Sequence, residues 1–245
     1  MTGTVLVTGG FGLVGSATVR RLTELGRHVV ATDLDTPANR KAVAQLPGGA
    51  EARWADVTDR NQAERLVAEV APEAIIHLAA IIPPPIYRNP KLARRINVDA
   101  TATLVHIAEA QPSPPRWVQA SSNAVFGARN PHRFTAPLRA DEPMKASDLY
   151  SAHKIEVEQI VRASSLEWVV LRLGGVLSVD PSAMKSLPSG RAIPPIDSKT
   201  ADNRLPRYSP WNCLTTSKNI FCWNTLSTGR FRAHAIAYFS TSASS

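Results

Sequence analysis

Short apolar runs rich in β-branched residues alternate with amphipathic helical stretches between residues 4 and 173. This alternation is typical of βαβ units, because parallel strands need a crossover connection and a helix supplies it. Right-handed crossovers build a doubly wound sheet whose binding crevice lies at the carboxyl ends of the strands. The pattern therefore predicts an α/β fold with a doubly wound parallel sheet.

The strand and helix boundaries follow from these periodicities. The predicted strands are residues 4–8, 28–33, 52–56, 74–80, 116–121 and 168–173. An apolar stripe predicts a helix over residues 12–25, which Gly26 can terminate. A second stripe predicts a helix over residues 59–70, where Asp59 and Gln62 fit a capping box.

A glycine-rich turn, "TGGFGLVG", follows the first predicted strand. Gly9, Gly12 and Gly15 are spaced by three residues, and Gly10 gives the alternative Gly-x-Gly-x-x-Gly spacing. Such glycines let backbone N–H groups at a helix N-terminus approach a pyrophosphate, as in Rossmann dinucleotide sites. Asp33 ends the second predicted strand, where a carboxylate can accept hydrogen bonds from ribose hydroxyls and repel a 2′-phosphate. The segment predicts dinucleotide binding with NAD preferred over NADP.

Tyr150 and Lys154, in "DLYSAHK", lie four residues apart and hence on one face of a helix. Alone, the pair fits two solvated side chains as well as it fits an enzyme site. A phenol has a pKa of about 10, and a nearby ammonium favours the phenolate and brings the group toward the working range of a general base. The other motifs decide between the two interpretations.

Taken together and in order, the motifs resemble those of the extended short-chain dehydrogenase/reductase group, the NAD-dependent epimerase/dehydratase family. The resemblance covers residues 4–177. The matching segments are "TGGFGLVG" (8–15), "ADVTD" (55–59), "HLAA" (77–80), "NV" (97–98), "SSNAVFG" (121–127) and "YSAHK" (150–154).

The resemblance implies NAD as cofactor and assigns residues to its site. The implied cofactor-binding residues are Gly9, Gly10, Phe11, Gly12, Leu13, Gly15, Asp33, Asp56, Val57, Leu78, Ala79, Ala80, Asn97, Tyr150 and Lys154. Ser122, Tyr150 and Lys154 are the implied catalytic residues. We expect Tyr150 to exchange a proton with a substrate oxygen, Lys154 to tune it, and the Ser122 hydroxyl to hold the same oxygen as charge develops there.

Some positions depart from the family pattern. Asn123 and Ala124 stand where family dehydratases have an Asp-Glu pair, which disfavours dehydration. His77 is predicted as a strand residue beside the cofactor and His153 as a helix-surface residue, with no second ligand at the spacing of a metal site. No metal site is predicted.

The C-terminal segment, residues 181–245, lacks the pattern of the preceding chain. It carries four isolated prolines, a Pro-Pro pair and many turn formers, and no element is assigned to it. Three interpretations stay open: a divergent substrate domain, a disordered tail, or a translation that leaves the ancestral frame near residue 180; the composition favours the last two. The predicted division is therefore an NAD-binding Rossmann domain with the catalytic residues over 1–180 and an atypical tail, truncated or disordered, over 181–245.

The function expected from these observations is an NAD-dependent epimerase or oxidoreductase acting on a hydroxyl-bearing carbon, with a nucleotide sugar as the substrate class by resemblance. The alternative is an NAD-binding protein without turnover. A weaker hypothesis makes the tail a nucleic-acid-binding arm, since it holds six of the eight net positive charges, but the charges form no run and nucleic-acid binding is not expected. No apolar run approaches the length of a membrane span, so a cytoplasmic protein is expected. A homodimer is left open.

Overall fold

The computed structural model of the protein describes residues 3–128, 139–178, 212–215 and 219–228; side chains beyond residue 176 are not described. The strands are β1 (Thr4–Thr8), β2 (His28–Asp33), β3 (Ala50–Trp54), β4 (Ala74–His77), β5 (Arg116–Ser122), β6 (Trp168–Ser178), β7 (Asn212–Thr215) and β8 (Asn219–Thr228). The α-helices are α1 (Leu13–Glu24), α2 (Pro37–Val43), α3 (Arg60–Val70), α4 (Pro90–Arg94), α5 (Ala100–Glu109) and α6 (Leu149–Ala163). Short 3-10 turns lie at Pro85–Tyr87 (η1) and Asn123–Phe126 (η3), and a π-helical turn at Arg95–Asp99 (η2).

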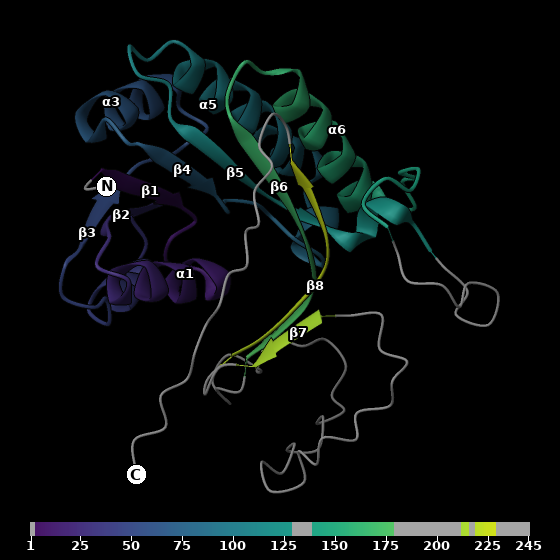
Figure 1. The fold of residues 1–245 in the computed structure, drawn as a ribbon, viewed down its shortest axis with the longest axis horizontal. Helices are drawn as coiled ribbons and strands as arrows, with labels where there is room; N and C mark the ends of the chain where they lie inside the picture. The colour runs from purple at the N-terminus through teal and green to yellow at the C-terminus, as the bar shows by residue number, and fades with distance from the viewer. Residues whose placement is uncertain (1–2, 129–138, 179–211, 216–218, 229–245) are drawn as a thin grey trace, which may run out of the picture.

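The strands form one sheet in the order β3-β2-β1-β4-β5-β6-β8-β7 (Figure 1). The first six are parallel, whereas β8 runs antiparallel to β6 and β7 antiparallel to β8. The chain adds strands outward from β1 to β3 and then returns to add β4, β5 and β6 on the other side. This reversal confirms the doubly wound fold and places its switch point between β1 and β4.

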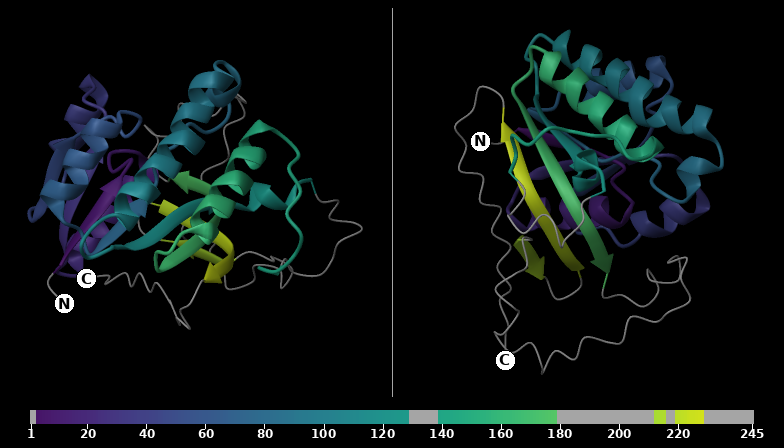
Figure 2. Two further views of the ribbon diagram at one scale, coloured as in Figure 1. Left: turned by 90° about the horizontal axis from the view of Figure 1, so that it is seen from above. Right: turned by 90° about the vertical axis from the view of Figure 1, so that its right-hand side faces the viewer.

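Helices cover both faces of the parallel part of the sheet. Figure 1 shows α3, α5 and α6 over one face and α1 against the other, and Figure 2 shows the same layers from two further directions. Side chains of β1 point alternately to the two faces of the sheet, so this strand contributes to the core on both faces. Leu6 points into the cluster under α3 and α5, while Val5 and Val7 pack with Val19 of α1.

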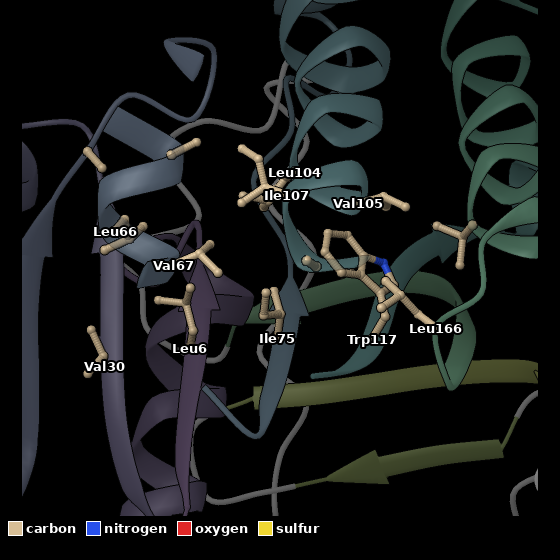
Figure 3. Packing of buried hydrophobic residues seen from close by; sticks show 14 of the residues in the cluster. Leu6, Val30, Leu66, Val67, Ile75, Leu104, Val105, Ile107, Trp117 and Leu166 are labelled. Atoms are coloured by element: carbon tan, nitrogen blue, oxygen red, sulfur yellow. The ribbon is translucent and has the colours of Figure 1, made fainter. Parts of the chain in front are cut away.

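The larger core lies under α3, α5 and α6 (Figure 3). Leu6, Ile75, Leu104 and Trp117 are fully buried there. Burying a Leu or Ile side chain contributes about 1.5–3 kcal/mol relative to exposure. The indole Nε1–H of Trp117 donates to Gln119 Oε1 at 3.1 Å, so the ring is buried without losing its hydrogen bond.

The predicted helix ends agree with the structure, with one difference in detail. Gly26 follows α1 with φ 73°, the left-handed conformation that ends a helix. Asp59 caps α3 by accepting from the N–H groups of Asn61 and Gln62. The Gln62 side chain does not complete the capping box on Asp59 N–H; its Oε1 accepts instead from the N–H of Asp56.

The C-terminal strands were not predicted from the sequence. Residues 212–215 and 219–228 extend the sheet beyond β6, although no element was assigned to them. All of the prolines that obscured the pattern precede residue 212, and β8 itself, "NIFCWNTLST", is rich in β-branched and aromatic residues. The division of the chain at residue 180 stays a prediction, and residues 179–211 lie outside the described part. None of the described helices is long and apolar enough to cross a membrane.

Candidate active site

The glycine-rich turn packs so closely that added side-chain atoms would collide with backbone. Gly9 has φ 64°, and a Cβ there would lie 2.8 Å from the Ala79 nitrogen. A Cβ on Gly15 would lie 2.0 Å from the Gly9 carbonyl oxygen. Gly12 caps α1 without a side chain, so no side chain caps the first-turn N–H groups of that helix. This geometry fits the anion-binding role predicted for the turn.

A cavity of about 240 Å³ opens beside this turn. Its lining includes eight predicted cofactor residues: Gly9, Gly12, Asp33, Asp56, Val57, Leu78, Ala79 and Ala80. The structure adds Thr32, Leu34, Ala55, Thr58, Ile81 and Ile96, which the motifs did not single out. All of these residues lie at or after the carboxyl ends of β1 to β4, or on η2, where a doubly wound sheet binds its ligand.

The remaining predicted cofactor residues lie outside this lining. A Cβ on Gly10 would meet Ala31 Cβ at 2.8 Å, so Gly10 serves close packing between β1 and β2. The Phe11 ring is 7% exposed and packs on Trp54 with a centroid distance of 5.2 Å. Leu13 is exposed at the start of α1. Their cofactor contacts stay predictions.

Asn97 lies behind the cavity wall. It is 3% exposed, its Oδ1 accepts from Ile81 N–H at 2.7 Å, and its Nδ2 donates to the Ile81 carbonyl oxygen at 2.8 Å. Both ends of the amide are thereby committed to the backbone of the segment after β4. Asn97 thus supports the wall, and its predicted cofactor contact stays a prediction.

His77 is held by hydrogen bonds to Thr8, at the end of β1, and to Thr101 of α5. Its Nδ1 lies 2.7 Å from Thr8 Oγ1 and its Nε2 2.9 Å from Thr101 Oγ1. Thr101 Oγ1 donates to the Asn97 carbonyl oxygen, so it accepts from His77 Nε2–H, and Nδ1 accepts from Thr8. Burial lowers the pKa of His77 to about 3, which keeps the ring neutral. His77 is therefore a buried link between β1 and α5, and it does not line the cavity.

A second cavity of about 340 Å³ lies next to the first. It is lined by Ile82, Pro83, Ser122, Asn123, Ala124, Tyr150, Leu173, Gly174 and Gly175. Ile81 lines the first cavity and Ile82 the second, so the two share one wall. The structure brings Ser122 and Tyr150, the predicted catalytic pair, together in the lining of this second cavity.

Tyr150 is held at the start of α6 by a network around the helix N-cap. Asp148 accepts from Ser151 N–H at 2.7 Å, and Tyr87 of η1 donates its hydroxyl to Asp148 at 2.9 Å. Burial raises the pKa of Tyr150, the hydrogen bond with Ser122 acts against that rise, and the Asp148 carboxylate adds to it. The phenol therefore carries its proton at neutral pH in the protein alone.

Lys154 is buried behind the second cavity. Its Nζ donates to the Ala120 carbonyl oxygen at 2.8 Å and lies 5.8 Å from the Tyr150 ring centroid. Burial lowers the pKa of Lys154 to about 8, and the Glu158 carboxylate acts against that shift. Burial has the largest effect on the pKa of Tyr150 and raises it, and the lowering expected from Lys154 stays a prediction.

A buried ion pair between Glu158 and Arg172 lies near the predicted catalytic residues. Glu158, one turn after Lys154, accepts from Arg172 Nε at 2.8 Å and from Arg172 Nη2 at 2.7 Å. It also accepts from the Ser121 hydroxyl at 2.6 Å, next to Ser122. Arg172 in turn donates to the Ala140 carbonyl oxygen, in the segment that leads to Tyr150. Both members of the pair are 2% exposed or less, so β5, β6 and α6 are joined by charges removed from water.

Two further side chains near the site, those of His153 and Phe126, are buried. His153 was predicted on the helix surface but is only 3% exposed, because α6 packs against η2 on that side. Phe126, which stands where the family pattern has a Tyr, is 7% exposed and packs under the Arg172 guanidinium at 4.8 Å. A ring is thus packed at this position although the hydroxyl is absent. Among the described residues, no group of three or more His, Cys, Asp or Glu could hold a metal ion.

Comparison with known proteins identifies the family. The sequence model of the NAD dependent epimerase/dehydratase family matches residues 5–197, most of the chain and some twenty residues past the resemblance seen in the motifs. The chain belongs to this family. Its membership confirms the recognition made from the motifs, and NAD is the cofactor on which the family depends.

Individual family members are similar over part of their length. A probable UDP-glucuronate 4-epimerase of Rhizobium meliloti (strain 1021) is 33% identical over 161 residues, which cover 62% of this chain and 46% of that protein. A UDP-glucose 4-epimerase of Azospirillum brasilense is 30% identical over 195 residues, 78% of this chain and 53% of that protein. The chain thus spans about half the length of these curated relatives.

Solved structures of the family share the fold. The UDP-glucose 4-epimerase of Thermus thermophilus, solved as a complex with NAD, has a TM-score of 0.60 and 28% identity, covering 69% of this chain and 54% of that one. The UDP-glucose 4-epimerase of Brucella ovis, also in complex with NAD, has a TM-score of 0.61 and 25% identity, covering 70% and 51%. The sheet and the order of its helices are therefore those of NAD-binding epimerases.

Proposed function

We propose that this chain binds NAD in the glycine-lined cavity and moves a hydride and a proton at a hydroxyl-bearing carbon of a nucleotide sugar. The observation that carries the proposal is the pairing of two adjoining cavities. One combines the glycine turn with the carboxylates of Asp33 and Asp56, and the other holds the hydroxyls of Ser122 and Tyr150. A dinucleotide and a hydroxyl-bearing substrate are the two ligands that such a pair fits.

The residues of the first cavity fit NAD in shape and charge. The turn between β1 and α1 has no room for a Cβ at Gly9 or Gly15, which leaves backbone to meet the pyrophosphate. Asp33 ends β2, and a carboxylate at this position can accept from ribose hydroxyls and repel a 2′-phosphate. When bound, NAD supplies the acceptor for the hydride.

The residues of the second cavity supply the proton chemistry. Tyr150 first releases its own proton to solvent; as the phenolate it takes the proton of the substrate hydroxyl when that carbon is oxidised and returns it when the carbonyl is reduced. The Ser122 hydroxyl holds the same oxygen as its charge changes. Buried Lys154, fixed on the Ala120 carbonyl, places a cation behind the phenol. A return of the hydride to the opposite face of the carbonyl would invert the centre, whereas release of NADH together with the keto product would give net oxidation.

The substrate class follows from the similar proteins. Curated relatives are named as epimerases of UDP-glucose and UDP-glucuronate at carbon 4. We infer that the substrate of this chain is a UDP-hexose or UDP-hexuronate with the reacting hydroxyl at carbon 4. Dehydration is not expected, because Asn123 and Ala124 offer no acid or base where the family's dehydratases have an Asp-Glu pair.

Product analysis tests this function. The purified chain is incubated with NAD and a panel of UDP-hexoses and UDP-hexuronates, and the sugar products are separated and their configuration at carbon 4 determined. An inverted or oxidised carbon 4 in one sugar of the panel is the expected result. Binding of NAD with every sugar recovered unchanged would favour the alternative, a cofactor-binding protein without turnover.

A further inference from the structure

Asn123 is a polar side chain that the fold itself does not use. It lines the second cavity between Ser122 and Ala124, at the start of η3. Its Nδ2 and Oδ1 are both withdrawn from solvent, and neither has a hydrogen-bond partner among the described residues. A buried amide without partners destabilises a protein, so its presence calls for an explanation.

Local structure does not supply that explanation. The cap of η3 is Ser122, whose Oγ accepts from Ala124 N–H at 3.2 Å. The turn would therefore form with alanine at position 123. Unpaired polar groups that a fold does not need are concentrated at functional sites, where a ligand completes them.

The cavity wall offers no partner either. Outside the segment Ser122–Ala124 and Tyr150, the lining consists of Ile82, Pro83 and Leu173, together with Gly174 and Gly175. A Cβ at Gly175 would meet no atom within 4 Å, so the wall is open at that point of β6. Ser122 and Tyr150 are the other polar side chains of this lining. No described residue supplies a partner, so the molecule that occupies the cavity is the candidate, with the amide turned toward it.

The chemistry of the amide limits what that partner can be. An uncharged amide has one accepting oxygen and two N–H donors, so it pairs best with a group that both donates and accepts, such as a hydroxyl. A carboxylate would satisfy Nδ2 but would place negative charge against Oδ1. Since Asn123 directly follows Ser122, the hydroxyl it reaches is the neighbour of the reacting one.

We propose that Asn123 is a specificity-determining residue that binds a second hydroxyl of the substrate, on the carbon next to the reacting carbon. The inference rests on the proposed function, and for a UDP-hexose that reacts at carbon 4 the second hydroxyl is that of carbon 3. The residue selects substrates with a vicinal pair of hydroxyls. It positions the substrate and transfers no proton.

The test compares two ligands on two proteins. Binding of UDP-glucose and of its 3-deoxy analogue is measured by calorimetry on the NAD-loaded wild-type chain and on Asn123→Ala. We expect Asn123→Ala to weaken UDP-glucose binding about tenfold to a hundredfold and to leave the 3-deoxy analogue unchanged. Asn123→Ser, which keeps a donor and an acceptor, should recover part of the difference. Without ligand, Asn123→Ala should unfold at the same or a higher temperature than the wild type.

The outcomes separate this inference from the proposed function. Equal weakening of both ligands by Asn123→Ala, or no weakening of either, would overturn the inference even if the wild-type chain epimerises UDP-glucose. Selective weakening of UDP-glucose without any turnover would support the inference while the proposed activity fails. If the wild-type chain binds neither sugar, the role of Asn123 fails together with the proposed substrate class.

Discussion

The two cavities at the carboxyl edge of the sheet are built from different parts of the chain. Around the cavity of about 240 Å³, backbone and small residues make the close approaches, as at Gly9 and Gly15. Around the cavity of about 340 Å³, side chains supply the polar groups, with Ser122 and Tyr150 held on elements that the buried Glu158 joins. Both cavities lie on one sheet and share one wall.

This difference bears on how each cavity can change. A site built from backbone tolerates no added atom, because a new Cβ displaces the main chain. A site built from side chains can be altered one group at a time, but its buried polar groups are costly unless each one finds a partner. We therefore expect cofactor binding to be uniform in such proteins and substrate preference to be set by residues such as Asn123.

Removing the charge of Glu158, which joins elements around the second cavity, should give the largest loss of stability. Glu158→Gln leaves the Arg172 guanidinium buried without its counter-charge, and breaking a buried pair in this way costs about 3–5 kcal/mol. The free energy of unfolding, measured in urea, checks the value. The matched control is Glu64→Gln, which breaks the exposed Arg60–Glu64 pair and should cost at most about 1 kcal/mol. Equal losses of unfolding free energy in the two variants would show that the buried Glu158–Arg172 pair does not stabilise the protein more than the exposed pair does.

Burial of His77 should make the free energy of unfolding depend on pH. The pKa of His77 is lowered to about 3, so between pH 6.5 and 3 the unfolded chain binds a proton at this ring that the folded chain does not. Wild-type stability is therefore lost as the pH falls through this window, whereas the glutamine of His77→Gln does not titrate. The gap in unfolding free energy between the two proteins should shrink by about 3 kcal/mol from pH 7 to pH 4. A gap that stays constant would mean that His77 is not held neutral.

Adding a single methyl group to the glycine-rich turn should weaken binding of the cofactor in the first cavity. Gly15→Ala forces a Cβ to within 2.0 Å of the Gly9 carbonyl oxygen, so the turn must open. We expect NADH binding, followed by fluorescence, to weaken at least about a hundredfold, or about 2.7 kcal/mol. Gly48→Ala is the control, since a Cβ there meets nothing within 4 Å. Unchanged binding by Gly15→Ala would contradict the backbone-built site.

The smallest effect is expected where the first cavity does use a side chain. Asp33→Ala removes both the ribose acceptor and the repulsion of a 2′-phosphate. The preference for NADH over NADPH should narrow about tenfold, or about 1.4 kcal/mol, in fluorescence titrations of both cofactors. Equal or tighter NADPH binding by the wild-type chain would show that Asp33 does not set the preference.

The same difference explains how far the sequence predicts the structure. The glycine turn, the parallel sheet and Asp33 are local signals, because a strand, a turn and a helix follow one another along the chain. The Glu158–Arg172 pair joins residues on a helix and a strand, and no local spacing indicates that their charges meet in the core. Strands β7 and β8 were missed because the predicted alternation ends before them.

Single side chains near the site show the same limit. Asn97 matched a motif, yet its amide is committed to Ile81, a contact that depends on how η2 packs behind β4. His153 was predicted at the surface from its helix alone, and packing against η2 buries it. Burial has the largest effect on the Tyr150 pKa and raises it, and the spacing of Tyr150 and Lys154 along the chain gives no measure of that burial.

The central claim is that Tyr150, in the side-chain cavity, exchanges the substrate proton while NAD is held in the backbone cavity. The most direct measurement is a single-turnover experiment in which the NAD-loaded chain is mixed with UDP-glucose and the fluorescence of bound NADH is followed. Wild-type protein should form NADH rapidly, and Tyr150→Phe should slow this step by at least about a hundredfold, the typical contribution of a general base, when both proteins are saturated with NAD. Equal rates in the two proteins, or no NADH from a wild-type chain that binds both ligands, would contradict the account.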